Sequence, residues 1–392
     1  MIPTTDRETT LPLLMVAGEA SGDQHGAALV QALREHFPHL QVYGLGGAAM
    51  RAVGVETLFD IGILNAVGAV EVARKIPLGL WVGYRLLRTA VNSGTRVVVL
   101  IDAPMFNLSF AGWATRAGLR VMYYISPQLW AWWPGRVRKV ARRVDKMLTL
   151  FPFEVPFYTA AGVDAEYVGH PLVDQLAHLP SPQQAAHTLG LDAQRPIVAL
   201  LPGSRQHEVA RLLPPMLQAL QRVKQRLPHV QGVLPIASTI NPVIIQTLQQ
   251  RFPVPLRLVQ GDSHTVLRAA DFAVVASGTA TLEAGLIGTP MVIVYRVHPL
   301  TAWLARRYIV LPYVGLVNIV AGRCVVPELL QEDVQPDAMA QMALRYLEDT
   351  AAAQRMRAAL AEISVTMGQG QGAQRAAACI GRFLRQEHPL TE

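Results

Sequence analysis

The chain of 392 residues is poor in cysteine and in charge, and it has no long uninterrupted apolar run. Its two cysteines, Cys324 and Cys379, form no CxxC pair, and no basic region followed by an apolar stretch and a cleavage site opens the sequence, so a reduced, cytoplasmic protein is expected. Because no run reaches about 18 uncharged apolar residues, no bilayer-spanning helix is predicted.

Motifs for several chemistries are also missing. The glycine loops lack the Gly-Lys-Ser/Thr ending of a nucleoside-triphosphate cradle, and there is no DxD pair and no HExxH motif. His25, His170, His207 and His298 are isolated, so each is expected to be a hydrogen-bonded structural residue rather than a metal ligand. Neither a metal nor a cofactor is therefore predicted.

What remains is a strongly apolar globular chain. Hydrophobic residues make up 51% and charged residues 16%, which excludes disorder and leaves room for two domains with their own cores. Lys plus Arg outnumber Asp plus Glu by 35 to 28, and this net charge of +7 favours anionic partners. Charge alone does not choose among phosphorylated substrates, acidic lipid and nucleic acid.

The clearest strand, loop and helix unit begins at Ile197. The apolar run Ile197–Leu201 predicts a strand buried on both faces, and it breaks at Pro202 and Gly203 before a helical pattern that begins near Glu208. Free loop amides and the helix dipole can bind an anion there, with Ser204 adding a hydroxyl and Arg205 a charged fork. Many such loops bind nothing, so a purely structural loop is the alternative.

A second unit of this kind follows Phe272–Val275. The strand runs into Ser277, Gly278 and Thr279, which offer hydroxyls and amides at the start of a helix. Glu283 either complements the dipole of this helix or accepts hydrogen bonds from the two ribose hydroxyls of a nucleotide.

The N-terminal half contains acidic loops instead. The strand Leu13–Ala17 precedes GEASGD, where Glu19 and Asp23 would repel a diphosphate, so a neutral polyol such as a sugar is the better ligand. The alternative for Asp23 is a structural role, in which its side chain only complements the N-terminus of a helix. The strand Arg96–Ile101 delivers Asp102 to the carboxyl edge of the sheet, where open α/β proteins place their chemistry, although a loop-capping role is also open.

Two segments combine apolar and basic residues. Ile61–Val91 is either a pair of core helices or an interfacial patch, and core packing is preferred. Trp130, Trp132 and Trp133 precede a helix in which Val137, Val140 and Val144 face inward and the basic residues of Arg136–Lys146 face outward. A solvated face, an anionic membrane surface and nucleic acid all fit this second pattern.

The repeated alternation of strand and helix predicts an α/β fold of two Rossmann-like parallel-sheet domains with a cleft between them. The expected division is an N-terminal domain at 1–170, a linker at 171–195, a second domain at 196–345 and C-terminal helices at 346–392.

Taken in order, the motifs AGEASGD, IDAPMFN, SPQLWAWW, GHPLVD, LLPGSRQHEV, ASGTATLEAGLIGTPMVIVYR and NIVAGR resemble the lipid A disaccharide synthase family, from about Leu13 to Glu332. The resemblance implies the GT-B architecture. It also implies an inverting transfer of 2,3-diacylglucosamine from its UDP donor to carbon 6 of 2,3-diacylglucosamine 1-phosphate.

The same resemblance assigns roles to the residues above. Asp102 is the expected general base, with Glu19 nearby on the acceptor side. The remaining residues are expected to bind the UDP-sugar: Ser204 and Arg205 at the diphosphate, Glu283 at the ribose, and Ser277, Gly278, Thr279, Asn318 and Arg323 around the donor pocket. Three positions depart from the family, with Met105 in place of an aspartate, Trp133 in place of an arginine and Val317 in place of a proline.

Because both substrates carry acyl chains, peripheral association with the cytoplasmic leaflet of the inner membrane is expected. A homodimer is left open, and no nucleic-acid partner is expected. Two other UDP-sugar enzymes of this architecture are the competing hypotheses, a UDP-N-acetylglucosamine 2-epimerase and the undecaprenyl-linked glucosaminyltransferase of peptidoglycan synthesis. IDAPMFN and SPQLWAWW argue against both. A basic nucleic-acid-binding protein is the alternative from another class, and it leaves the two sets of strand-end loops unexplained.

Overall fold

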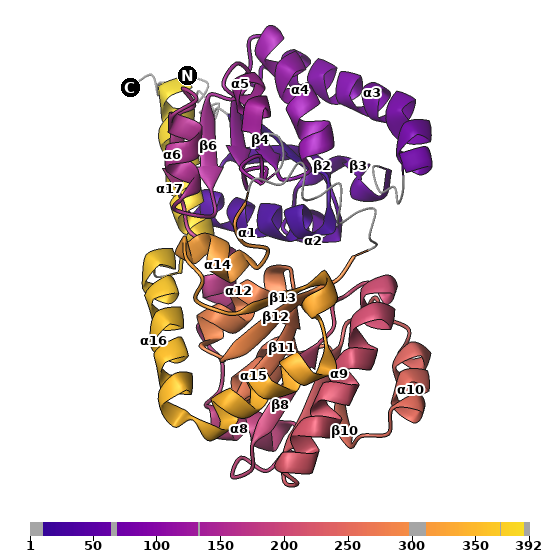
Figure 1. Ribbon diagram of the computed structural model, residues 1–392. Coiled ribbons are helices and arrows are strands. Elements are labelled where there is room, and N and C mark those ends of the chain that lie inside the picture. The colour runs from indigo at the N-terminus through magenta and orange to yellow at the C-terminus, as the bar shows by residue number, and fades with distance from the viewer. Residues whose placement is uncertain (1–10, 64–68, 132–133, 298–310, 369, 388–392) are drawn as a thin grey trace, which may run out of the picture. The chain divides into compact units, whose positions relative to one another are not determined.

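The structure, a computed structural model, describes residues 11–63, 69–131, 134–297, 311–368 and 370–387 (Figure 1). The chain divides into two compact units, one formed by Met1–Pro171 with Gly370–Glu392 and the other by Leu172–Gln369. Each unit has one parallel sheet with helices on both faces, which confirms the α/β prediction. In the described part of the chain, no helix is both long and apolar enough to cross a membrane.

The first unit is built on a seven-stranded sheet of order β3-β2-β1-β4-β5-β6-β7. Every residue of β4 is fully buried because helices cover both faces, and this is why the strand sequence is continuously apolar. The strands are β1 (Leu11–Ala17), β2 (Leu40–Gly46), β3 (Glu56–Asp60), β4 (Val97–Ile101), β5 (Arg120–Tyr124), β6 (Lys146–Thr149) and β7 (Ala165–Tyr167).

The helices of this unit lie in two layers. One layer contributes Val82, Leu86 and Phe110 to the core beside the sheet, and in the other layer α1 packs against α17. The helices are α1 (Ala20–His36), α2 (Ala48–Ala52), α3 (Ala69–Asn92), α4 (Pro104–Arg116), α5 (Val137–Val140), α6 (Glu154–Thr159) and α17 (Gly372–Glu387).

The second unit has a six-stranded sheet of order β10-β9-β8-β11-β12-β13. Its strands are β8 (Ile197–Leu201), β9 (Gln231–Ile236), β10 (Leu256–Gln260), β11 (Phe272–Ala276), β12 (Met291–Tyr295) and β13 (Glu328–Leu330). Its helices are α8 (Pro182–Thr188), α9 (Gln206–Arg226), α10 (Pro242–Arg251), α11 (Ser263–Ala269), α12 (Thr279–Ile287), α14 (Leu316–Ala321), α15 (Pro336–Glu348) and α16 (Thr350–Met367). Helix α9 packs beside α15, and α12 packs beside α16.

The segment expected to be a linker contains ordered helices. Helix α7 (Pro171–Leu176) spans the change of unit, and α8 begins with a capping box formed by Ser181 and Gln184. Helix α8 packs on α11, where Arg268 Nε donates to the Pro180 carbonyl at 2.9 Å. Most of this segment is therefore part of the second unit.

The C-terminal helices are shared between the units. Helix α16 belongs to the second unit, whereas α17 returns to the first. There the Phe37 ring lies where a Cβ on Gly381 would be 2.8 Å away, and Arg382 pairs with Glu166 at 2.9 Å. The missing side chain at Gly381 is thus what allows α17 to approach the end of α1.

Candidate active site

Both sheets have a point where the strand order reverses. The chain winds outward from β1 through β2 and β3 and then returns to β4 on the other side of β1, and the second unit repeats this between β8 and β11. Loops diverge at such a switch point and leave a crevice at the carboxyl ends of the strands. Glu19 and Asp102 follow β1 and β4, and the loops at Gly203–Arg205 and Ser277–Thr279 follow β8 and β11. The structure thus brings the predicted residues to two switch points, one in each unit.

Asp102 has a strained backbone that three hydrogen bonds hold. Its φ is 49°, and that of the following Ala103 is 45°. Its carbonyl accepts from the Tyr123 hydroxyl at 2.6 Å and from Asn107 Nδ2 at 2.8 Å, while its N–H donates to the Tyr124 carbonyl at 3.1 Å. Left-handed backbone in non-glycine residues concentrates at functional sites, where surrounding contacts enforce it.

The carboxyl group of Asp102 is electrostatically unusual. Burial, and after it the negative charge of Glu19, raise its pKa to about 6, while the Ala103 N–H acts against this rise. Glu19 stands at the N-cap of α1, is exposed, and makes no capping hydrogen bond with its side chain. At neutral pH Asp102 is mostly ionised and still basic enough to accept a proton, which suits a general base.

Asn107 is a site residue that the sequence analysis did not single out. Its side chain is fully buried in α4, and Nδ2 donates to the carbonyls of Val16, Ile101 and Asp102 at 3.4, 3.0 and 2.8 Å. The amide therefore ties the end of β1 to the end of β4. The asparagine of IDAPMFN was the available signal, since it follows Asp102 by five residues and lies in the first turns of α4.

Asp23 has the structural role that was the alternative for it. Its buried carboxylate accepts from the backbone N–H groups of Gly47, Ala49 and Met50 at 2.6, 2.9 and 3.0 Å. These are the free amides at the start of α2, so Asp23 caps that helix. A Cβ on Gly47 would lie 2.6 Å from the same carboxylate, which explains a glycine there.

In the second unit the loop after β8 presents Ser204 and Arg205 to solvent. Gly203 has a φ of 107°, and this turn brings Arg205 to the N-cap of α9. The Arg205 guanidinium pairs with Glu208 at 2.9 Å and remains 72% exposed. Exposed pairs of this kind contribute little, about 0 to 1 kcal/mol, so the guanidinium is free to turn toward an anion.

The loop after β11 presents a hydroxyl and amides beside an acid. Gly278 and Thr279 are exposed at the start of α12, while the Ser277 hydroxyl donates to the Val314 carbonyl at 2.9 Å. Glu283 lies 3.4 Å from His264 Nε2 and 3.5 Å from the Ser263 hydroxyl. The hydrogen bond to Glu283 raises the pKa of His264, against the effect of burial. His264 is a second residue that the sequence analysis missed, because nothing in its local pattern points to Glu283.

Asn318 and Arg323 differ from expectation. Asn318 is fully buried: its Nδ2 donates to Glu328 and to the Val326 carbonyl, both at 2.8 Å, and its Oδ1 accepts from two backbone N–H groups at 2.9 Å. The side chain shapes its loop from inside and does not present its amide to a ligand. Arg323 is exposed and pairs with Glu362 of α16 at 2.6 Å.

Helix α3 combines the two patterns considered for its segment. Val82, Leu86 and Ala90 are buried in the core, as the preferred hypothesis predicts. Six other apolar side chains are 41–58% exposed, namely Ile76, Leu78, Leu80, Trp81, Tyr84 and Val91. We call these six residues the α3 patch. Exposed Arg85 stacks over the Trp81 ring at 5.8 Å, so basic and apolar groups share this surface.

In the basic segment Arg136–Lys146, some of the side chains expected to face outward are bound within the first unit. Val140 and Val144 are buried, as expected, but the helix α5 covers only Val137–Val140. Arg143 donates to the Leu108 carbonyl at 2.8 Å, and Lys146 lies in β6 and pairs with Asp164 and Glu166. Trp132 and Trp133 lie outside the described residues.

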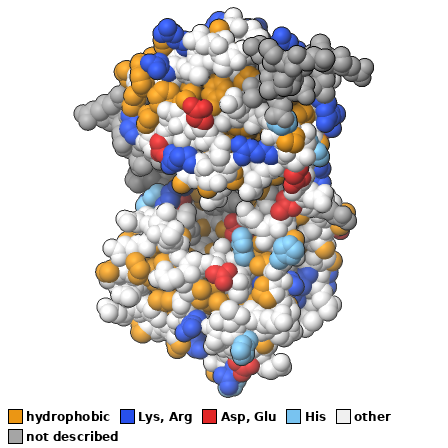
Figure 2. Space-filling view, turned by 180° about the vertical axis from the view of Figure 1, so that it is seen from behind, with side chains coloured by type: hydrophobic (Ala, Val, Ile, Leu, Met, Phe, Trp, Pro, Cys, Tyr) orange, Lys and Arg blue, Asp and Glu red, His pale blue; other side chains and the backbone are white. Residues whose placement is uncertain are grey.

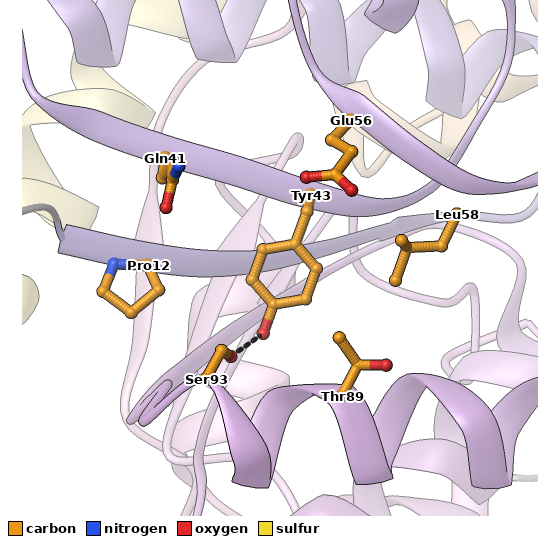
Figure 3. Close-up of a pocket in the computed structure, with 7 residues that line it drawn as sticks. All are labelled: Pro12, Gln41, Tyr43, Glu56, Leu58, Thr89 and Ser93. Carbon is orange, nitrogen blue, oxygen red and sulfur yellow. Dashed lines mark hydrogen bonds between the residues drawn. The ribbon is translucent and has the colours of Figure 1, made fainter.

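A cavity of about 200 Å³ lies at the other end of the first sheet (Figure 3). Pro12, Gln41 and Glu56 line it from the first two residues of β1, β2 and β3, and the Tyr43 hydroxyl bonds to Ser93 at 2.8 Å. Because these are the amino ends of the strands, this cavity is separate from the switch point. In the residues that the structure describes, no three His, Cys, Asp or Glu side chains are grouped to hold a metal ion.

Comparison with solved structures defines the fold class. Similar structures include a UDP-N-acetylglucosamine 2-epimerase from Listeria monocytogenes (TM-score 0.66, 14% identical, covering 96% of this chain and 97% of that one) and the calicheamicin glycosyltransferase (TM-score 0.59, 15% identical, covering 97% and 100%). With its two Rossmann-like units, the chain has the same GT-B fold as these structures.

Sequence relatives then define the family. The family described as lipid-A-disaccharide synthetase matches residues 13–381. Lipid-A-disaccharide synthases from Geobacter sulfurreducens and Myxococcus xanthus are 42% and 44% identical over 96% and 95% of this chain and cover 98% and 97% of their own length. The chain belongs to the lipid-A-disaccharide synthase family and is a glycosyltransferase. The epimerase, peptidoglycan and nucleic-acid hypotheses are not favoured.

Proposed function

We propose that this chain joins UDP-2,3-diacylglucosamine to 2,3-diacylglucosamine 1-phosphate, giving lipid A disaccharide 1-phosphate and UDP. The observation that carries the proposal is Asp102, a carboxylate with a raised pKa at the switch point of the first unit. The carbon 6 hydroxyl of the acceptor attacks the anomeric carbon of the donor and gives its proton to Asp102. The bond from that carbon to the UDP oxygen breaks, and inversion follows because the new bond forms opposite to the leaving group.

The donor would be held by the second unit. Ser204, Arg205 and the amides at the start of α9 would hold the diphosphate and its growing negative charge. Glu283 would accept from the ribose hydroxyls, with His264 fixing its carboxylate. Ser277, Gly278 and Thr279 would line the same pocket. Arg323 would need to leave Glu362 to contact the donor.

A product assay tests the reaction. The purified protein, given both lipid substrates in detergent, should release UDP and form the disaccharide phosphate, seen by mass spectrometry. An isomerised UDP-sugar without a disaccharide would instead indicate an epimerase. No conversion of either lipid by folded protein would refute the proposal.

Arg205→Ala tests the donor site. UDP binding measured by calorimetry should weaken roughly 10- to 100-fold, the scale of a lost charge-assisted hydrogen bond. Arg226→Ala is the matched control, since Arg226 lies at the other end of α9 and pairs with Glu348 at 3.2 Å. Equal affinities for the wild type and Arg205→Ala would remove Arg205 from the phosphate site.

We further propose that the enzyme binds the cytoplasmic leaflet of the inner membrane through the α3 patch. In Figure 2 hydrophobic side chains gather with Lys and Arg side chains beside them on the unit that carries α3. Trp81 and Tyr84, 50% and 58% exposed, suit a membrane interface, and Arg85 and Arg88 suit anionic headgroups. Met105, 77% exposed three residues after Asp102, adds an apolar side chain near the acceptor site.

Vesicle co-sedimentation tests this surface. Binding to anionic vesicles should decrease with added salt and decrease strongly in Trp81→Ser/Tyr84→Ser. Val243→Ser is the control, because Val243 is an equally exposed apolar residue of α10, at 59%. A double variant that sediments like the wild type would exclude the patch. A homodimer remains a prediction that light scattering can test.

A further inference from the structure

A second buried carboxyl group lies at the same edge of the first sheet as Asp102. Glu154 begins α6, the helix that follows β6 after a short loop, and is only 1% exposed. Its Oε1 accepts from the Trp130 indole N–H at 2.8 Å, and its Oε2 accepts from the Phe151 N–H at 3.1 Å. The carboxyl group therefore joins the loop after β6 to the loop after β5, at the carboxyl edge of the sheet where β4 also ends.

The loop after β5 starts next to Asp102. Strands β4 and β5 pair up to Ile101 and Tyr124, and the Asp102 N–H donates to the Tyr124 carbonyl. The next residue, Ile125, has a φ of 68° and so turns the chain sharply out of the sheet. The segment Ser126–Ala131 thus begins two residues after the Tyr124 carbonyl that holds Asp102.

This segment is held by a hydrogen bond and by packing, yet part of it is exposed to solvent. The Tyr158 hydroxyl donates to the Pro127 carbonyl at 2.7 Å, and Leu129 is buried. The Trp130 ring meets Phe153 edge to face at 5.0 Å between centroids, yet it stays partly exposed. A partly exposed indole held at its N–H can offer its face to a sugar ring or an acyl chain.

Burying a carboxyl group costs stability unless its partners offset the loss of water. Burial outweighs the hydrogen bonds from the Trp130 indole and the Phe151 N–H, so that the pKa of Glu154 is raised to about 7. An apolar side chain would fill the same space at lower cost. The carboxyl group, in contrast, accepts from the indole N–H and so fixes the orientation of the ring.

We propose that Glu154 is a positioning residue for the acceptor: by holding the Trp130 N–H it fixes the segment Ser126–Ala131 beside Asp102, so that the acceptor lies against the Trp130 ring. This inference rests on the proposed function. It predicts that Glu154 acts through Trp130 and affects the acceptor, while UDP binding by the second unit is unaffected.

A double-mutant cycle with Glu154→Gln and Trp130→Phe tests it. Each single variant should lower kcat/KM for the acceptor roughly 10- to 100-fold, the scale for a displaced reactant, and should leave UDP affinity unchanged. The kcat/KM of the double variant should be no lower than that of the more impaired single variant, because both changes remove the same interaction. Trp113→Phe, an indole of the same unit that packs on Phe110, should behave as wild type.

An indole N–H spectrum reads the contact without any activity. Trp130→Phe identifies the Trp130 signal in ¹⁵N-labelled protein, and Glu154→Gln should move that signal alone. Trp130→Phe keeps a ring in place, so it tests the role even where Glu154→Gln fails to fold. Unchanged acceptor kinetics in folded Trp130→Phe, or additive losses in the double variant, would overturn the inference. An inactive wild type would instead overturn the proposed function, and the positioning role with it.

Discussion

Replacing Asp102 by asparagine isolates the proton transfer from the fold. The backbone at Asp102 has a φ of 49°, which asparagine tolerates at least as well as aspartate, whereas alanine would add strain. The three hydrogen bonds that hold the residue use only its backbone atoms. Asp102→Asn should therefore change the proton acceptor and little else.

The expected loss is large. A positioned general base contributes about 10²- to 10⁴-fold, so the chemical step should slow by that factor while UDP affinity is unchanged. Single-turnover kinetics at saturating acceptor measure this step. In the wild type, kcat/KM for the acceptor should fall as pH drops below about 6, because protonated Asp102 cannot accept a proton.

The contribution of Asp102 to folding stability should depend on pH in the opposite direction to activity. The pKa of Asp102 is raised in the folded state, so its stabilising contribution is complete below its ordinary value near 3.8 and is lost as pH rises through about 6. Asp102→Asn should then be at least as stable as the wild type at pH 8. A folded variant that keeps more than about a tenth of the chemical rate, well short of the expected loss, would place the base elsewhere, with Glu19 next.

Two further predictions concern residues around these sites. Glu19→Gln should shift the acidic limb of the pH profile to lower pH, because the Glu19 charge raises the pKa of Asp102; an unmoved limb would show that the two carboxyl groups are not coupled. Asn318→Ala should destabilise the second unit by about 3 kcal/mol in urea unfolding, since it leaves two backbone N–H groups without their partner and removes one of the hydrogen bonds to Glu328. A loss under about 0.5 kcal/mol, typical of surface changes, would contradict that internal role.

The sequence predicts the central strands closely, because parallel strands covered on both faces must be apolar throughout. Ile197–Leu201 is β8 to the residue, and the predicted Arg96–Ile101 and Phe272–Val275 differ from β4 and β11 by one residue. Polar residues that directly follow such strands lie at the carboxyl edge by geometry. This is why Asp102 and Arg205 could be located from the sequence.

Contacts between distant segments could not be predicted in this way. The return of α17 to the first unit depends on Gly381 meeting Phe37, which is more than 300 residues away in the chain. Lys146 looks like one of several exposed cations in its segment, yet it begins β6 between Asp164 and Glu166. A local pattern shows the charge of a side chain but not the partner that the fold supplies.

Glu19 and Asp23 show how that partner decides the role of an acid. The two stand four residues apart in one acidic loop, and the sequence assigns both to a polyol site. The start of α2 brings three unpaired N–H groups to Asp23, so its charge is satisfied inside the unit. Glu19 has no such capping bond and lies close enough to Asp102 to raise its pKa. Of the two acids, only Glu19 therefore has a carboxylate that is left to act on Asp102.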